Sequence, residues 1–388
     1  MQNFIFQNAT KVYFGKGCVK EYLACLLRGS QRVLLAYGGG SIKANGVYGQ
    51  VMGILSAAGK TVVEFAGICP NPTYAKVQQG AALAREEKVD IILGIGGGSV
   101  IDCCKAVAMA AVYPGDIWDD FWARPGVVDF EPLPLGVIVT AAGAGSEMNG
   151  GAVITNEEKK IKTGRDYPAC NPRFALMDPT YTLSLPKEQM VSGGFDILSH
   201  IMEAYFSWPD EDNVSDDIAE ALMQGVIRDL RASVKDPQDY TARSNLMWES
   251  AMAENRILKL GKRCGFPCHQ IEHQLGAYTD CNHGQGLAVL HPAYYRRICG
   301  PEKQKFARFA TRVWGIPAGG KSEEELAHAG VEALAGFIQE LGLPTTLRQL
   351  GLADAKMLPV IADSCNLEPA SCPKITKEEI LTLLQACF

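Results

Sequence analysis

Apolar residues follow two different patterns along this chain. In the first part, short apolar runs rich in β-branched residues alternate with segments of helical spacing. The runs predict strands at 32–37, 61–65, 90–95, 135–140 and 174–177. The segments between them predict helices at 46–58, 74–87 and 100–112. Near-continuous apolar strands that alternate with helices predict a parallel sheet that is covered on both faces.

The second pattern begins near residue 185, where the strand-like runs nearly disappear. Amphipathic spacing there predicts helices at 187–206, 214–234, 241–260, 303–313 and 323–341. We therefore expect an α/β domain of the Rossmann type over residues 1–184 and an all-α domain over residues 185–388.

Length and composition are those of an ordinary globular protein and exclude several classes. The chain has 388 residues, long enough for two domains, and its formal charge of -6 argues against binding to nucleic acid or to anionic membranes. The longest apolar run is about half of a membrane span. Thirteen cysteines, an odd number, fit reduced thiols better than a disulfide framework. With no signal peptide evident, we expect a cytoplasmic protein.

Three glycine-rich loops each follow a predicted strand. The first is Gly38-Gly39-Gly40-Ser41, the second runs from Gly96 through Gly97 and Gly98 to Ser99, with Asp102 after it, and the third runs from Thr140 past Ser146 to Asn149. Ligands of parallel sheets bind at the carboxyl ends of strands, and glycines let backbone N–H groups approach a phosphate. One such loop is usually a tight turn, but three predict a dinucleotide site. None is the G-x-G-x-x-G fingerprint.

The first of these loops also bears on the choice of dinucleotide. NAD sites usually place a carboxylate after an early strand, where it accepts a hydrogen bond from the ribose 2′-hydroxyl. Here that position offers glycines, Ser41 and Lys43. We expect that nothing repels a 2′-phosphate, which favours NADP(H). The alternative is that Lys43 is an ordinary surface lysine.

Histidines and one aspartate suggest a metal site in the second half. Asp196 and His200 are four residues apart, as are His269 and His273, so each pair shares one helix face. His283 lies fourteen residues after His269, too far along one helix to share a metal ion. A turn at 278–284 must therefore separate two helices. One carboxylate and up to three imidazoles suit Fe(II) or Zn(II), whereas any single histidine among them could be a core or surface residue.

The motifs that contain these residues resemble one known family. GGFDILSHIMEAY, HQIEHQLGAYTDCNHGQGLAVLHP, GGGSVIDCCK and GAGSE together resemble the iron-containing (group III) alcohol dehydrogenases over essentially the whole chain. YGGGSIKANGV, PNPTY with Asn71, and MNGGAVI resemble the NADPH-dependent butanol dehydrogenase and broad-range aldehyde reductase branch. The resemblance implies a dehydroquinate-synthase-like α/β domain, a helical domain and a homodimer.

The resemblance also implies roles for particular residues. The metal ligands would be Asp196, His200, His269 and His283, and His273 would lie near the nicotinamide and the substrate. Cofactor positions would be Gly38, Gly39, Gly40, Ser41, Asn71, Gly97, Gly98, Ser99, Asp102, Thr140, Ser146, Asn149 and Lys162. Two features depart from the family pattern. Ala144 stands where many members have threonine, and Cys268 and Cys281 lie beside ligand positions, where we expect them to be packing residues.

The implied activity is hydride transfer between NADP(H) and a primary alcohol or aldehyde, with the metal polarising the substrate oxygen. His273 would pass a proton or orient the substrate, or else make only a supporting hydrogen bond. Three alternatives remain open: a glycerol-dehydrogenase-like polyol oxidoreductase, a dehydroquinate-synthase-like lyase, and a non-catalytic protein that binds a metal or a nucleotide. A lyase acting on a phosphorylated acid would need many basic residues, and the motif segments have few.

Overall fold

The computed structural model describes residues 2–209, 213–365, 367 and 375–388. The chain forms two compact units. The α/β unit contains Gln7–Pro186 and Gln238–Asn255, and the helical unit contains Met1–Phe6, Lys187–Pro237 and Arg256–Phe388. The segment Gln238–Asn255 thus leaves the helical half of the sequence and packs with the α/β unit. A single division at residues 184–185 does not anticipate this exchange.

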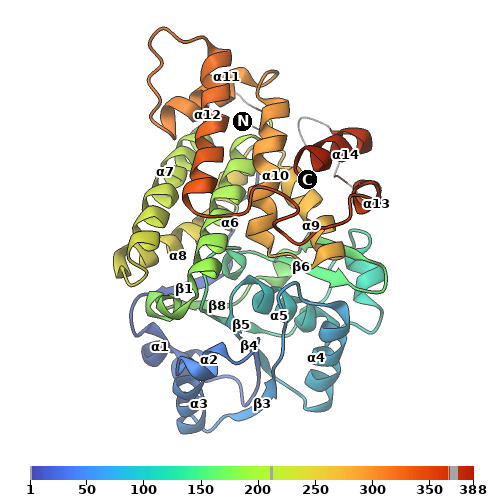
Figure 1. Cartoon of the computed structure of the whole chain (residues 1–388). Coiled ribbons are helices and arrows are strands. Elements are labelled where there is room, and N and C mark those ends of the chain that lie inside the picture. The colour runs from blue at the N-terminus through green and yellow to red at the C-terminus, as the bar shows by residue number, and fades with distance from the viewer. Residues whose placement is uncertain (1, 210–212, 366, 368–374) are drawn as a thin grey trace. The chain divides into compact units, whose positions relative to one another are not determined.

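Six parallel strands form the centre of the α/β unit (Figure 1). Their order across the sheet is β1-β8-β5-β4-β2-β3. The strands are β1 (Lys11–Phe14), β2 (Arg32–Tyr37), β3 (Thr61–Phe65), β4 (Ile91–Gly96), β5 (Leu135–Val139) and β8 (Phe174–Met177). Because β5, β4 and β2 are adjacent and parallel, the glycine-rich loops that follow them lie at one edge of the sheet.

Helices cover both faces of this sheet, as the apolar pattern predicts. Val33, Leu35 and Tyr37 of β2 belong to the core beneath α1 (Cys18–Leu26) and α3 (Val47–Ala57). Leu34 and Ala36 point the other way, into the core beneath α4 (Tyr74–Glu86) and α5 (Gly98–Ala110). Since successive strand residues face opposite sides, one run of apolar residues supplies both cores.

Several elements of the α/β unit do not follow from the apolar pattern. β6 (Gly151–Asn156) and β7 (Ile161–Asp166) form a separate antiparallel hairpin, which is too polar to read as a buried strand pair. The chain also contains β1, α1 and a short α2 (Ser41–Ala44), none of which was predicted.

α8 (Tyr240–Glu254) ends six residues before its predicted end. It stops where Asn255 caps it and Arg256 takes a positive φ of 76°, a backbone conformation that breaks a helix.

The helical unit is built around α6 (Lys187–Tyr205) and α10 (His283–Ile298). α10 packs against α6, α9, α12 and α14. The other helices of the helical unit are α7 (Val214–Lys235), α9 (Pro267–Thr279), α11 (Lys303–Arg312), α12 (Glu323–Glu340), α13 (Met357–Ser364) and α14 (Lys377–Ala386). Asp280–Asn282 forms the turn between α9 and α10 that the histidine spacing requires. In the part of the chain that the structure describes, no helix is long and apolar enough to cross a membrane.

Candidate metal centre and dinucleotide site

Two of the predicted ligands lie on one face of α6. Asp196 and His200 are one helical turn apart, and both are largely buried. The Nδ1 atom of His200 lies 2.8 Å from the backbone oxygen of Asp196 and 3.2 Å from its carboxylate Oδ1 atom. Because Nδ1 faces the helix that carries it, the other ring nitrogen of His200 remains to bind an ion.

The other two predicted ligands come from α9 and from the first residue of α10. Pro267 begins α9, and its first turn contains His269. Asn282 caps α10 by accepting a hydrogen bond from the Gln285 backbone N–H, so that His283 opens the helix. A side chain at Gly284 would place its Cβ 2.2 Å from the Ser192 carbonyl oxygen of α6. The first turn of α10 therefore packs directly on the α6 backbone, which fixes the position of His283.

The three histidines lie around the carboxylate of Asp196. The Nε2 atoms of His269 and His283 each lie 3.6 Å from Asp196 Oδ1, and the rings of His200 and His269 are 4.2 Å apart. Asp196 Oδ1 and His269 Nε2 are buried and make no hydrogen bond. Buried polar atoms nearly always have a hydrogen-bond partner or a bound ion, so two neighbouring atoms that lack a hydrogen bond fit a cation site. The carboxylate and imidazole donors therefore fit a divalent metal ion.

Two buried glutamates, which the sequence reasoning missed, hold the far side of the histidine rings. The Nδ1 atom of His269 is hydrogen-bonded to Glu203, and that of His283 to Glu272. A carboxylate can only accept, so each Nδ1 donates and each Nε2 turns toward the centre. Helical spacing carried a signal for both, since Glu203 lies seven residues after Asp196 and Glu272 three after His269.

The charges of this cluster affect one another strongly. Burial disfavours the charged form of His269, but the carboxylates of Asp196 and Glu203 outweigh it and raise the pKa of His269 to about 10. Burial likewise opposes ionisation of Asp196, yet His200 and His283 hold the pKa of this carboxyl well below its usual range. The cluster therefore keeps its carboxylate ionised, as a metal ligand must be, and it favours a proton on His269 that a bound metal ion would displace.

His273 and the two nearby cysteines lie around this centre. The ring of His273 stacks on that of His283, with centroids 5.7 Å apart, and is partly exposed. Asp196, His200 and His269 form one group of potential ligand atoms that lie close together, and Glu272, His273 and His283 form a second. Cys268 is fully buried, and burial raises the pKa of its thiol well above the usual range. The Cys281 thiol lies 3.8 Å from Glu272. Among the described residues, neither cysteine joins a group of potential ligands.

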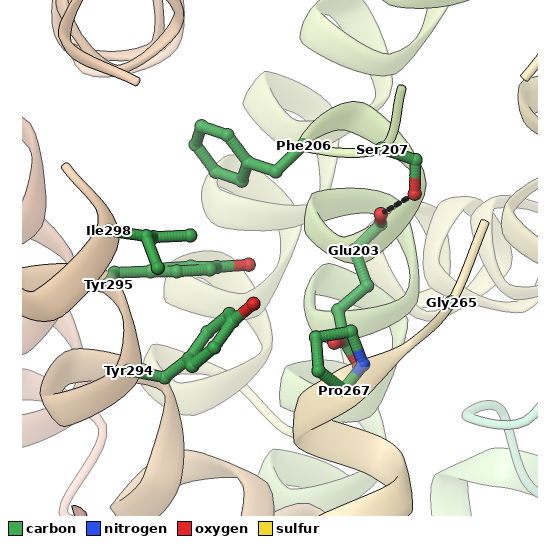
Figure 2. Close-up of a pocket in the computed structure, with 8 residues that line it drawn as sticks. All are labelled: Glu203, Phe206, Ser207, Gly265, Pro267, Tyr294, Tyr295 and Ile298. Atoms are coloured by element: carbon green, nitrogen blue, oxygen red, sulfur yellow. Dashed lines mark hydrogen bonds between the residues drawn. The ribbon is translucent and has the colours of Figure 1, made fainter. Parts of the chain in front are cut away.

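A small cavity lies beside Glu203, where the end of α6, the start of α9 and α10 meet (Figure 2). The hydroxyl groups of Tyr294 and Tyr295 point toward it, and the Ser207 hydroxyl donates a 2.6 Å hydrogen bond to the Glu203 backbone oxygen. The volume open to the centre of a water molecule in this cavity is about 10 Å³. This cavity can hold about one water molecule, and it is too small for a substrate.

In the α/β unit, the second and third glycine-rich loops are joined through a buried lysine that the sequence reasoning did not select. The ammonium group of Lys105 donates to Ser146 Oγ at 2.7 Å, Asn149 Oδ1 at 3.1 Å and the Gly151 oxygen at 2.6 Å. Ser146 in turn donates to Asp102 at 2.5 Å. The structure thus brings Asp102, Ser146 and Asn149 together, in a network that also fixes both loops.

The remaining predicted cofactor residues lie along the same edge of the sheet or next to it. Thr140 follows β5, and its backbone N–H donates to Gly96, next to Gly97, Gly98 and Ser99. Cβ atoms at Gly97 and Gly98 would lie 3.1 and 2.6 Å from the Cβ atoms of Ala141 and Ala144, so only glycine allows the two loops to approach this closely. The hairpin pairs Lys162 with Thr155, whose N–H donates to Pro72, next to Asn71.

The first loop is less simple than its sequence suggests. Gly38, Gly39, Gly40 and Ser41 follow β2 as expected, but Lys43 lies 3.7 Å from the carboxylate of Glu64. Glu64 comes from β3, the neighbouring strand, where it is paired with Leu35. The expectation that nothing near this loop repels a phosphate did not include this carboxylate, which lies beside Lys43. It considered only residues that follow β2 in sequence, whereas the carboxylate arrives through strand pairing.

Comparisons with known proteins match the whole chain to one group. Residues 9–179 match the family described as iron-containing alcohol dehydrogenase, and residues 190–388 match the C-terminal domain of the Fe-containing alcohol dehydrogenase family. The chain is 38% identical over all of both sequences to a probable NADH-dependent butanol dehydrogenase of Bacillus subtilis. It is 35% identical to the NADPH-dependent aldehyde reductase YqhD of Escherichia coli, covering 93% of this chain and 92% of that protein. The crystal structure of an NADH-dependent butanol dehydrogenase A from Thermotoga maritima matches with a TM-score of 0.93 and 36% identity, over 100% of this chain and 99% of the other.

Proposed function

This chain belongs to the iron-containing alcohol dehydrogenase family, and from this premise we propose that it interconverts aldehydes and primary alcohols with NADP(H) at a single divalent metal ion. The metal ligands would be Asp196, His200, His269 and His283. The observation that carries this proposal is the convergence of these side chains from three helices, with Asp196 Oδ1 and His269 Nε2 buried and without hydrogen bonds. Butanal-like aldehydes are the proposed substrates.

Each residue of the centre has a definable task in this reaction. A divalent ion held by three neutral imidazoles and one carboxylate would keep a net charge of about +1 and would supply a counter-charge for the substrate oxygen, while the nicotinamide would supply the hydride. Glu203 and Glu272 hold Nδ1 of two imidazoles so that their Nε2 lone pairs stay available. His273, beside His283 and partly open to solvent, would give the proton to the product alcohol or orient the substrate.

The dinucleotide would bind at the carboxyl ends of β2, β4 and β5. In favour of this site are three glycine-rich loops on adjacent strands and the close approach of Gly98 to Ala144. The choice of NADP(H) rests on Ser41 and Lys43, which can hold a 2′-phosphate. Glu64 opposes that choice, and two of the similar proteins are named for NADH.

We further propose Fe(II) as the metal, with Zn(II) as the alternative, a homodimeric assembly, and a cytoplasmic location.

The experiment follows NADPH and NADH oxidation by absorbance, with butanal, glyoxal or dihydroxyacetone, in protein of measured metal content. We expect rapid NADPH oxidation with butanal, and a loss of at least about tenfold after the metal is chelated, because the substrate oxygen then lacks its counter-charge. Preference for dihydroxyacetone would instead support a polyol oxidoreductase. Metal-loaded protein that oxidises neither cofactor would refute the proposed activity and support a binding protein.

A further inference from the structure

Four side chains meet beside the first glycine-rich loop, and we call them the Lys43–Glu64 cluster: Tyr37, Lys43, Tyr48 and Glu64. The carboxylate of Glu64 accepts hydrogen bonds from both tyrosine hydroxyls, that of Tyr48 at 2.7 Å. The ammonium group of Lys43 lies 4.5 Å from the centre of the Tyr48 ring and 5.3 Å from that of Tyr37. The two tyrosines therefore fix the carboxylate of Glu64 through hydrogen bonds, while their rings only lie near the ammonium group of Lys43.

The carboxylate in this cluster is fixed, whereas the lysine is only loosely held. Hydrogen bonds from Tyr37 and Tyr48 and the charge of Lys43 keep the pKa of Glu64 below its usual range. Lys43 lies 3.7 Å from Glu64, beyond hydrogen-bond distance, and about half of its side chain is exposed. A lysine held in this way can turn toward a second anion at little cost in free energy.

The location of the cluster matches the part of a dinucleotide that differs between the two cofactors. Lys43 is two residues beyond Ser41, and Glu64 is one residue from the carboxyl end of β3, which lies beside β2. Sites that select NAD use a carboxylate near this edge to accept a hydrogen bond from the ribose 2′-hydroxyl and to repel a 2′-phosphate. Here a carboxylate, which would favour NAD(H), lies beside an ammonium group, which would favour NADP(H).

We propose that Lys43 and Glu64 together set the cofactor preference, with Glu64 favouring the 2′-hydroxyl of NAD(H) and Lys43 the 2′-phosphate of NADP(H). This inference rests on the proposed dinucleotide site at the first glycine-rich loop. A 2′-phosphate gains an ion pair with Lys43 but lies near the ionised Glu64, whereas a 2′-hydroxyl can donate to Glu64 and leaves the Lys43–Glu64 pair intact. Because the two effects oppose each other, the enzyme discriminates weakly, so the proposed preference for NADP(H) over NAD(H) is small.

Binding of two small probes to the metal-loaded enzyme tests this proposal. Adenosine 2′,5′-bisphosphate and 5′-AMP differ only in the 2′-phosphate, and calorimetry gives the ratio of their dissociation constants. Glu64→Gln should shift this ratio toward the bisphosphate, and Lys43→Met should shift it toward AMP, each by roughly tenfold at low salt. Both shifts should shrink at high ionic strength, because the side chains are partly exposed. The NADPH-to-NADH ratio of kcat/KM should move in the same directions.

Glu87→Gln is the matched control, since Glu87 also pairs with a basic residue, Arg32, which is the first residue of β2 and lies at the end of the strand opposite the glycine-rich loop. It should leave the probe ratio unchanged. If Glu64→Gln and Lys43→Met leave the ratio within about twofold of the wild-type value, the proposed selection is wrong even though the site is real. If the wild-type enzyme binds neither probe, the proposed dinucleotide site itself is wrong.

Discussion

At the scale of single residues, the centre depends on side chains that would not touch the metal as much as on those that would. The carboxylate of Glu203 accepts a hydrogen bond from the Nδ1–H group of His269. It also accepts hydrogen bonds from the backbone N–H groups of Cys268 and His269. Its carboxylate thereby ties α6 to the first turn of α9. Partners of this kind orient a ligand and raise its basicity.

Glu203→Gln should lower metal affinity by about 10- to 100-fold, because an amide can present its N–H₂ group to His269 and favour the wrong tautomer. Competition with a chromogenic chelator gives the dissociation constant for Zn(II) without any activity assay. Glu332→Gln, an exposed carboxylate paired with Arg296, is the control. Equal affinities in all three proteins would show that Glu203 only fills space.

The sequence names candidate ligands of the centre but not the groups that support them. Metal chemistry restricts the residue types and their spacing, and the family resemblance selects Asp196, His200, His269 and His283 among the candidates, an assignment that stays a prediction. Glu203 and Glu272 are chemically ordinary, and only the packing of α6, α9 and α10 shows which rings they face. Similarly, Glu64 is one of many surface acids until strand pairing places it near Lys43.

At the scale of elements, the junction between α6 and α10 determines where His283 lies. Ser192 of α6 donates a hydrogen bond to Asn282, the residue that caps α10, and Gly284 packs against the Ser192 backbone. A longer side chain at position 284 has no space. The two helices are thus joined at backbone distance within one residue of a proposed ligand.

Gly284→Ala should move the first turn of α10 and displace His283, because the added Cβ would lie 2.2 Å from the Ser192 oxygen. We expect metal affinity to fall by about tenfold or more, since a shift of about 1 Å misplaces a functional group. Gly336→Ala in α12 is the control, because a Cβ there meets nothing within 4 Å. An unchanged affinity in Gly284→Ala would mean that α10 tolerates the methyl group without moving His283.

The central strands and long helices were predictable because burial imposes a clear period on their sequences. β2, β3 and β8 begin and end at the predicted residues. The β6–β7 hairpin was missed because only part of it is buried and its β7 strand carries Lys162, Arg165 and Asp166.

The helical pattern of α8 was evident, yet amphipathic spacing shows only that a helix has an apolar face and not which core that face packs against. In the structure, Ser250 of α8 accepts from Gly143 and Gly145 of the third glycine-rich loop.

At the scale of the whole molecule, one buried carboxyl group should give the stability a dependence on pH. Glu147 is almost fully buried in the α/β unit, and one of its oxygens makes no hydrogen bond. Burial raises the pKa of Glu147 to about 7. Unfolding returns this group to its ordinary pKa of 4.5, so the folded protein binds the proton more tightly than the unfolded chain does.

The contribution of this group is fully present below pH 4.5 and is lost as the pH rises through about 7. Glu147→Gln cannot ionise, so it should unfold at a higher temperature than the wild type at pH 8, by several degrees, and at a similar temperature at pH 4.5. Thermal unfolding followed by circular dichroism at both values measures this difference. A midpoint shift that is the same at the two pH values would show that Glu147 does not titrate in this range.

We propose above that one divalent ion, bound by Asp196, His200, His269 and His283, is required for aldehyde reduction. The most direct measurement titrates Fe(II) under anaerobic conditions into metal-free wild-type protein and into His269→Ala, recording bound iron and NADPH-dependent butanal reduction in the same samples. We predict that wild-type activity rises in proportion to bound iron and saturates at about one ion per chain, whereas His269→Ala binds little iron and remains inactive. Full activity in metal-free wild-type protein, or in His269→Ala, would contradict the account.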